Sequence, residues 1–79
     1  MKRISILGAT GSIGQSTIDL IRRDIANYDV VALTGGRNVD QLARDAIELG
    51  AKQAVTCEPA LFGALKDRLA GTGIEAAAG

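Results

Sequence analysis

Short apolar runs alternate along the chain with longer segments in which apolar residues recur at helical spacing. The apolar runs, several of them rich in β-branched residues, predict strands at residues 2–7, 30–33, 53–56 and 74–78. The helical spacing predicts helices at residues 12–25, 39–49 and about 59–69. Short connections between them imply right-handed crossovers. We therefore predict an α/β fold in which a Rossmann-like parallel sheet, in the strand order 3-2-1-4, carries helices on both faces.

Individual residues predict where these helices begin, end and pack. In the first helix the apolar face is expected to comprise Ile13, Thr17, Leu20 and Ile21, widened by Ile18 and Ile25. Asn38 is a suitable N-cap for the second helix, and Gly50 is suited to end it. Pro59 stands where the first turn of the third helix tolerates it.

Three evenly spaced glycines interrupt the pattern between the first strand and the first helix. They lie in the segment Leu7-Gly8-Ala9-Thr10-Gly11-Ser12-Ile13-Gly14. A strand-to-helix turn of this kind directs the free N–H groups of the helix, and the positive end of its dipole, at a bound anion such as a pyrophosphate. Gly8 lets the chain leave the strand sharply, Gly11 lets the backbone approach phosphate, and Gly14 lets the helix pack closely. The alternative is a turn that binds no ligand.

The spacing of these glycines, GxxGxxG, is one residue longer than in the GxGxxG loop. The wider loop is expected to carry the side chain of Thr10 or Ser12 toward the ligand. No Lys-Ser or Lys-Thr follows the last glycine, so the loop is not a Walker loop.

A second loop, after the second predicted strand, indicates which dinucleotide is bound. An NAD site places an acidic residue at the end of that strand, where this chain has Thr34. Arg37 follows three residues later, and a guanidinium grips a ribose phosphate that a carboxylate would repel. Gly36 and Asn38 supply further N–H and amide donors, so the loop favours NADP. An ordinary exposed arginine, and a strand-end hydroxyl without a ligand at Thr34, are the alternatives.

Composition excludes several other functions. Nine basic and nine acidic residues balance, and no basic stripe or group of aromatic residues indicates nucleic-acid binding. No apolar segment is long enough for a membrane span. The single cysteine, Cys57, favours a reducing compartment, the cytoplasm.

Without histidine, Thr10 and Ser12 have no base to make them nucleophiles. We expect no catalytic residue here, and no metal site, because the carboxylates are expected on helix exteriors: Asp19, Asp24, Asp40, Asp45, Glu48 and Asp67.

Three stretches together resemble the N-terminus of the 1-deoxy-D-xylulose 5-phosphate reductoisomerase family. They are Ile4-Ser5-Ile6-Leu7-Gly8-Ala9-Thr10-Gly11-Ser12-Ile13-Gly14 with Ser16-Thr17, then Val31-Ala32-Leu33, then Gly36-Arg37-Asn38-Val39. The resemblance is specific over the first 39 residues and looser beyond them. Gly35 and Arg37 depart from the alanine and lysine that are more usual in the family, the latter with its charge preserved.

The resemblance implies a function for the chain as a part of a longer enzyme. Members of the family rearrange deoxyxylulose phosphate and reduce the product with NADPH, giving methylerythritol phosphate for isoprenoid synthesis. Residues 1–79 would then be the N-terminal NADP(H)-binding Rossmann domain, incomplete as given, of a cytoplasmic homodimer. The residues that contact the cofactor in the family correspond in this sequence to Thr10, Gly11, Ser12, Ile13, Gly36, Arg37 and Asn38. The divalent metal (Mg or Mn), the sugar phosphate and the catalytic residues would be held beyond residue 79.

Two other interpretations remain open on the residues alone. The chain is compatible with another NADP-dependent oxidoreductase, such as a semialdehyde dehydrogenase or an extended short-chain reductase. It is also compatible with a dinucleotide-sensing module that catalyses nothing.

Overall fold

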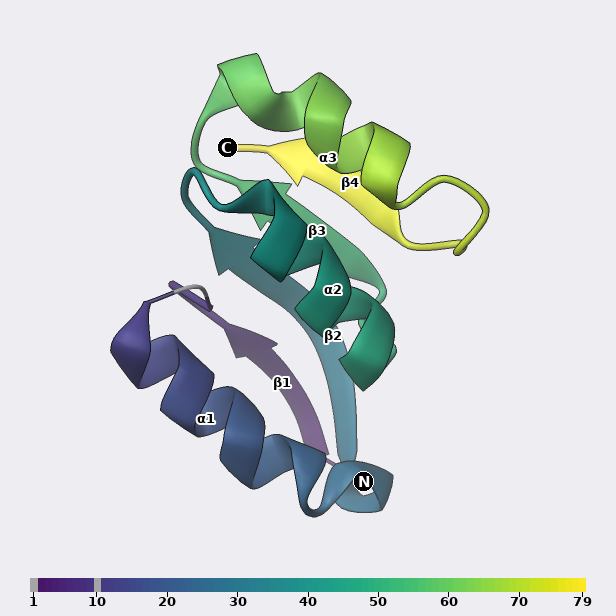
Figure 1. Cartoon of the computed structure of the whole chain (residues 1–79). Helices are drawn as coiled ribbons and strands as arrows, with labels where there is room; N and C mark the ends of the chain where they lie inside the picture. Colours follow the sequence, from purple (N-terminus) through teal and green to yellow (C-terminus); the bar gives the residue numbers. More distant parts are fainter. Residues whose placement is uncertain (1, 10) are drawn as a thin grey trace.

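A computed structural model describes residues 2–9 and 11–79 as a four-stranded parallel sheet with helices between the strands (Figure 1). The strands are β1 (Lys2–Ile6), β2 (Tyr28–Gly35), β3 (Gln53–Thr56) and β4 (Glu75–Ala78). The helices are α1 (Ser12–Arg22), α2 (Val39–Leu49) and α3 (Phe62–Arg68), with 3₁₀ turns η1 (Ile25–Asn27) and η2 (Pro59–Leu61). The α/β prediction and the succession of elements are confirmed. None of the helices described is long and apolar enough to cross a membrane.

The predicted strand order is wrong, because the sheet runs β1-β2-β3-β4. β4 pairs with β3, Val55 lying opposite Ala77, instead of returning to β1. α3 packs beside α2, where it buries Leu65 and forms an exposed ion pair between Arg68 and Asp40. A helix fixed beside α2 on its far side from α1 delivers the next strand to the free edge of β3.

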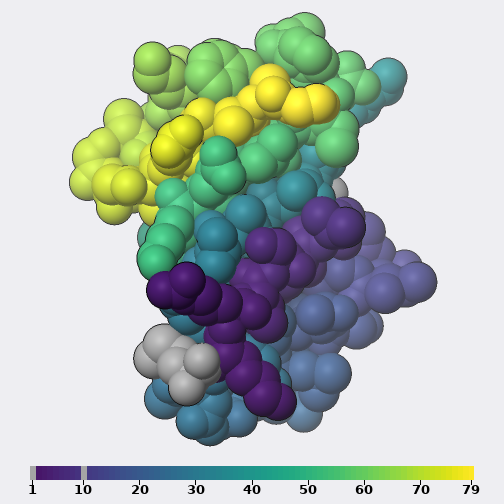
Figure 2. All heavy atoms as spheres, turned by 180° about the vertical axis from the view of Figure 1, so that it is seen from behind, coloured from purple at the N-terminus to yellow at the C-terminus, as the bar shows by residue number. Residues whose placement is uncertain are grey.

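The prediction of helices on both faces is also wrong for the residues described. Right-handed crossovers that all move in one direction place their helices on one face, and Figure 1 shows α1, α2 and α3 on the same side. From behind, Figure 2 shows the strands uncovered. The strand register places Ala32, Val55 and Ala77 on this second face, where they are half-buried.

The core lies between the sheet and the three helices. Its fully buried larger side chains are those of Ile18, Val30, Leu33, Leu42 and Leu65. In α1 the buried residues are Gly14, Ile18 and Ile21, so the predicted apolar face is only partly right. Ile13 and Leu20 are exposed to 84% and 67%, which removes both from the core.

The ends of the helices follow local signals more closely than their faces do. Asn38 caps α2 by accepting a hydrogen bond from the N–H of Gln41 (3.1 Å), as predicted. Gly50 ends α2 in the left-handed conformation (φ 65°), also as predicted. α1 ends at Arg22 instead of Ile25, which belongs to η1, and Pro59 opens a 3₁₀ turn ahead of α3.

Candidate functional site

The two loops predicted to bind the cofactor lie at one edge of the sheet. β1 and β2 are parallel neighbours with Ile6 opposite Leu33, so the loops that leave their carboxyl ends emerge side by side (Figure 1). The first loop leads into α1 and the second into α2. Helix N-termini at this edge of a parallel sheet are where such folds bind phosphates.

The first loop is anchored to the end of β2 by Thr34. The hydroxyl of Thr34 accepts a hydrogen bond from the N–H of Gly8 (3.0 Å), and its carbonyl accepts one from the N–H of Ala9 (2.7 Å). Gly8 itself has a φ of 67°, a left-handed conformation that favours glycine. Thr34 therefore has a structural role, which the sequence interpretation of a strand-end hydroxyl did not include.

Gly14 and Gly11 differ in what their backbone positions allow. A Cβ built on Gly14 would lie 2.1 Å from the carbonyl oxygen of Gly8 and 2.7 Å from the Cα of Ala9. The close approach predicted for Gly14 is therefore present, and its partner is the backbone of the loop. A Cβ on Gly11 would meet only the carbonyl oxygen of Gly8 at 3.5 Å, an ordinary contact. The fold alone does not require glycine at position 11.

The first turn of α1 is open to an anion. Gly11 occupies the N-cap position and no described side chain caps the helix, so the N–H groups of the first turn project from its end. A hollow of about 470 Å³ lies over this turn, lined by Leu7, Gly8, Gly11, Ser12, Ile13, Gly14 and Thr17. The exposure of Ile13, which removes it from the core, places its side chain at this hollow. Thr10, another predicted contact, lies outside the described residues.

The second loop presents a cation beside the first. The hydroxyl of Thr56, on β3, donates a hydrogen bond to the carbonyl of Gly36 (2.8 Å) and so fixes the loop from below. The side chain of Arg37 is 87% exposed and lies 3.7 Å from a carboxylate oxygen of Glu58. Surface ion pairs of this kind are weak, so Arg37 is free to turn toward an anion. The Asn38 oxygen is the capping atom, and its amide N–H₂ group has no hydrogen-bond partner among residues 2–9 and 11–79.

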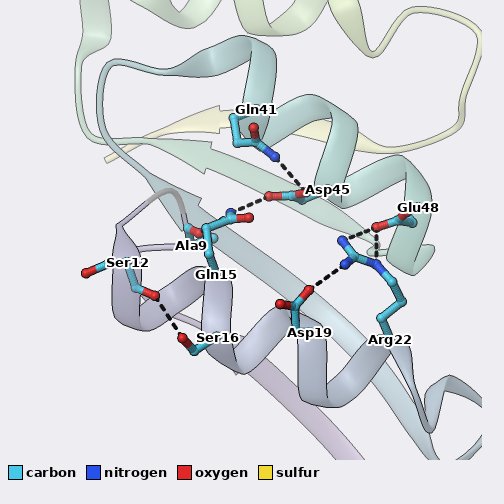
Figure 3. A network of polar contacts seen from close by, with 9 residues as sticks. All are labelled: Ala9, Ser12, Gln15, Ser16, Asp19, Arg22, Gln41, Asp45 and Glu48. Atoms are coloured by element: carbon cyan, nitrogen blue, oxygen red, sulfur yellow. Dashed lines mark hydrogen bonds and ion pairs between the residues drawn. The ribbon is translucent and has the colours of Figure 1, made fainter.

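A partly buried polar network that the sequence did not predict lies behind the first loop (Figure 3). The Gln15 amide N–H₂ donates to the carbonyl of Ala9 (2.8 Å) and to the Asp45 carboxylate (2.8 Å). The amide of Gln41 donates to the other carboxylate oxygen of Asp45 (3.0 Å). Asp45 is only 2% exposed, so its predicted place on the helix exterior is wrong. The only signal in the sequence was the helical spacing of Gln41 and Asp45.

A second, exposed connection joins the other ends of α1 and α2. The guanidinium of Arg22 bonds to Asp19 (2.6 Å) within α1 and to Glu48 (2.6 Å) on α2. The hydrogen bond to Glu48 raises the pKa of Arg22 further above its already high ordinary value. Arg22 therefore remains charged throughout the physiological pH range.

Comparison with known proteins identifies the family. The sequence model of 1-deoxy-D-xylulose 5-phosphate reductoisomerase matches residues 4–79. The chain belongs to this reductoisomerase family. The assignment sets aside the semialdehyde dehydrogenases and extended short-chain reductases that the residues alone left open.

Individual reductoisomerases match almost the whole chain. The enzyme of Ruegeria sp. (strain TM1040) is 67% identical over 79 residues, and that of Zymomonas mobilis is 53% identical over 78 residues. The chain spans 20% of the length of each of these relatives.

Solved reductoisomerase structures share the fold described above. A reductoisomerase from Zymomonas mobilis in complex with NADPH superposes with a TM-score of 0.97 at 52% identity, covering 99% of this chain and 21% of its own. A second, in complex with NADPH, fosmidomycin and magnesium, gives 0.91 at 33% identity, covering 100% of this chain and 20% of its own. Within residues 2–9 and 11–79, no three metal-binding side chains come together.

Proposed function

We propose that this chain is the NADPH-binding N-terminal part of an enzyme that converts 1-deoxy-D-xylulose 5-phosphate into 2-C-methyl-D-erythritol 4-phosphate. The observation that carries the proposal is the pair of loops at one sheet edge, one offering free helix N–H groups and the other a guanidinium. Its support from relatives is a reductoisomerase in complex with NADPH that superposes on this chain at 52% identity.

In this proposal each loop binds a different phosphate of the cofactor. The first turn of α1, with Gly8, Gly11, Ser12, Ile13 and Gly14, receives the pyrophosphate, and Thr10 joins them. NADPH has a phosphate on its adenosine ribose, and this phosphate meets Arg37 with the N–H of Gly36 and the amide of Asn38. Arg37 exchanges Glu58 for the phosphate when the cofactor binds. When bound, NADPH supplies the hydride for the reduction, and this chain supplies position and charge.

The remaining parts of the reaction belong to residues outside this chain. Magnesium accompanies NADPH in a related structure, and we propose that a divalent metal and the sugar phosphate are bound by carboxylates beyond residue 79. Residues 1–79 then form the first part of a Rossmann domain in a cytoplasmic homodimer.

Titration of the full-length protein with NADPH and NADH tests this function. Replacing Arg37 with alanine removes a charge-assisted hydrogen bond worth about 1.5–3 kcal/mol, so NADPH affinity is expected to fall about ten- to hundredfold. NADH lacks the ribose phosphate, so its affinity is expected to change little. Arg44→Ala, an exposed arginine on α2, is the matched control and is expected to leave both affinities unchanged. Equal losses for the two cofactors in Arg37→Ala would remove Arg37 from the phosphate site, and a wild-type protein that binds no NADPH would refute the function.

A further inference from the structure

The partly buried network of Gln15, Asp45 and Gln41 has no part in the cofactor contacts proposed above. We propose that Gln15 and Asp45 are positioning residues that hold the two phosphate-binding loops at a fixed separation, so that one dinucleotide can span them. The inference rests on the proposed function, because it presumes that both loops bind the same cofactor.

The first step is that both N–H groups of the Gln15 amide and both carboxylate oxygens of Asp45 are hydrogen-bonded. The two N–H groups of the Gln15 amide go to Ala9 and to Asp45. Each carboxylate oxygen of Asp45 accepts from a glutamine, and no buried side-chain polar atom among the described residues lacks a partner. A carboxylate that is 2% exposed is costly to leave unpaired, which resists any displacement that breaks one of these bonds.

The second step is that the network links three elements: the first loop, α1 and α2. Gln15 lies one turn inside α1, Ala9 lies in the first loop, and Asp45 lies on α2 (Figure 3). Ala9 is itself fully buried, with its N–H bound to the carbonyl of Thr34 (2.7 Å). Gln15 therefore binds the carbonyl of Ala9, while Thr34 of β2 binds the N–H of the same residue.

The third step is that α2 carries the second loop at its N-terminus. Asn38 caps α2 and Arg37 directly precedes it, so a shift of α2 relative to α1 moves Arg37 relative to the pyrophosphate turn. A misplacement of about 1 Å at a binding or catalytic group is enough to reduce function severely. The Arg22–Glu48 pair joins the same two helices, but it is exposed and lies at the ends away from the loops.

Affinities for two ligands of different length distinguish a positioning role of the network from an effect on stability alone. NADPH contacts both loops, whereas adenosine 2′-monophosphate has no 5′-phosphate and contacts only the second. In the full-length protein, Gln15→Met keeps the length of the side chain and removes both donors. We expect its NADPH affinity to fall about tenfold, with adenosine 2′-monophosphate affinity unchanged within about twofold. The matched control, Glu48→Gln, loosens the exposed connection and is expected to leave both affinities unchanged.

A milder variant covers the case in which Gln15→Met does not fold. Gln41→Met removes one donor to Asp45 and leaves the Gln15–Ala9 bond intact, and we expect NADPH affinity about threefold weaker with the same selectivity for the longer ligand. Equal losses for both ligands, or unchanged NADPH affinity in a folded variant, would overturn the positioning role. Wild-type protein that binds adenosine 2′-monophosphate and NADPH normally would leave the proposed function standing in that case, whereas wild-type protein that binds neither would refute both.

Discussion

The fold of the chain does not require glycine at position 11. A Cβ at this position would meet one backbone atom at ordinary contact distance, and Gly11 lines the hollow over the first turn of α1. The lack of a side chain at position 11 therefore matters only to a ligand bound in that hollow. A substitution at this position is a direct test of the proposed pyrophosphate site.

Gly11→Val is therefore expected to abolish NADPH binding in the full-length protein while the fold is retained. The added side chain would occupy the space through which backbone N–H groups reach the pyrophosphate. Cofactor titration measures the loss, and circular dichroism with thermal unfolding checks the fold. Normal NADPH binding by this variant would mean that the loop has been assigned the wrong ligand.

Local features of the sequence predicted the two loops of the candidate site, but not the hydrogen bonds that hold these loops in place. Glycine spacing and a cation after the second strand were visible locally in the sequence, as was the cap at Asn38. The contacts of Thr34 with Gly8 and of Gln15 with Asp45 join residues far apart in the chain. Charge alone placed Asp45 outside, because the burial of a carboxylate depends on partners that no local pattern reveals.

Among the elements, α1 explains why a helical pattern does not determine a helix face. Ile13, Thr17 and Leu20 have the same spacing as Gly14, Ile18 and Ile21, so periodicity supports either set. The second set is buried, because only Gly14 lets the helix approach the Gly8–Ala9 backbone so closely. A position without a side chain thus determined which side of the helix faces the core.

Gly14→Ala is accordingly expected to destabilise the fold through the packing of α1. A methyl group 2.1 Å from the carbonyl oxygen of Gly8 forces the helix away from the loop, and overpacking of this kind typically costs about 1–3 kcal/mol. Urea unfolding of the full-length protein measures the loss.

Gly63→Ala is the control for this substitution, because a Cβ there meets nothing within 4 Å. In an exposed helix position the change from glycine to alanine is expected to stabilise by about 0.5–1 kcal/mol. A Gly14→Ala protein as stable as the wild type would show that α1 does not depend on this close approach.

At the scale of the whole molecule, the helices described cover only one face of the sheet (Figure 1). Parallel sheets are normally covered on both faces, yet the second face of this sheet is uncovered (Figure 2). Val55 and Ala77, which lie on that face, are only half-buried. The strand order was predicted wrongly because it, too, depends on packing between segments that are distant in the sequence. Alternation of strands and helices specifies parallel crossovers, but the direction of each crossover depends on where a helix packs, as α3 does beside α2.

Residues 1–79 produced alone are therefore expected to be marginally stable and catalytically inert. The single cysteine allows no intrachain disulfide, and within the part of the chain that the structure describes no third layer covers the sheet (Figure 2). Thermal unfolding is expected at low temperature, raised modestly by NADPH, because a ligand that binds only the folded state stabilises it. Turnover of deoxyxylulose phosphate by the purified segment, free of full-length enzyme, would contradict this expectation and require a catalytic site within these residues.

The order β1-β2-β3-β4 also bears on how the protein is made. Among the described strands, β2, β3 and β4 each pair with the strand that precedes them in the chain. Each of these pairings therefore closes a loop of one helix, and none of them must wait for a distant segment. Closing such short loops costs less entropy than closing long ones, and folds built from local contacts form faster. As the chain leaves the ribosome, each βα unit can therefore dock on an edge that is already complete. Among the described strands, β1 and β2, which carry the proposed phosphate-binding loops, are then paired before β3 and β4 join them.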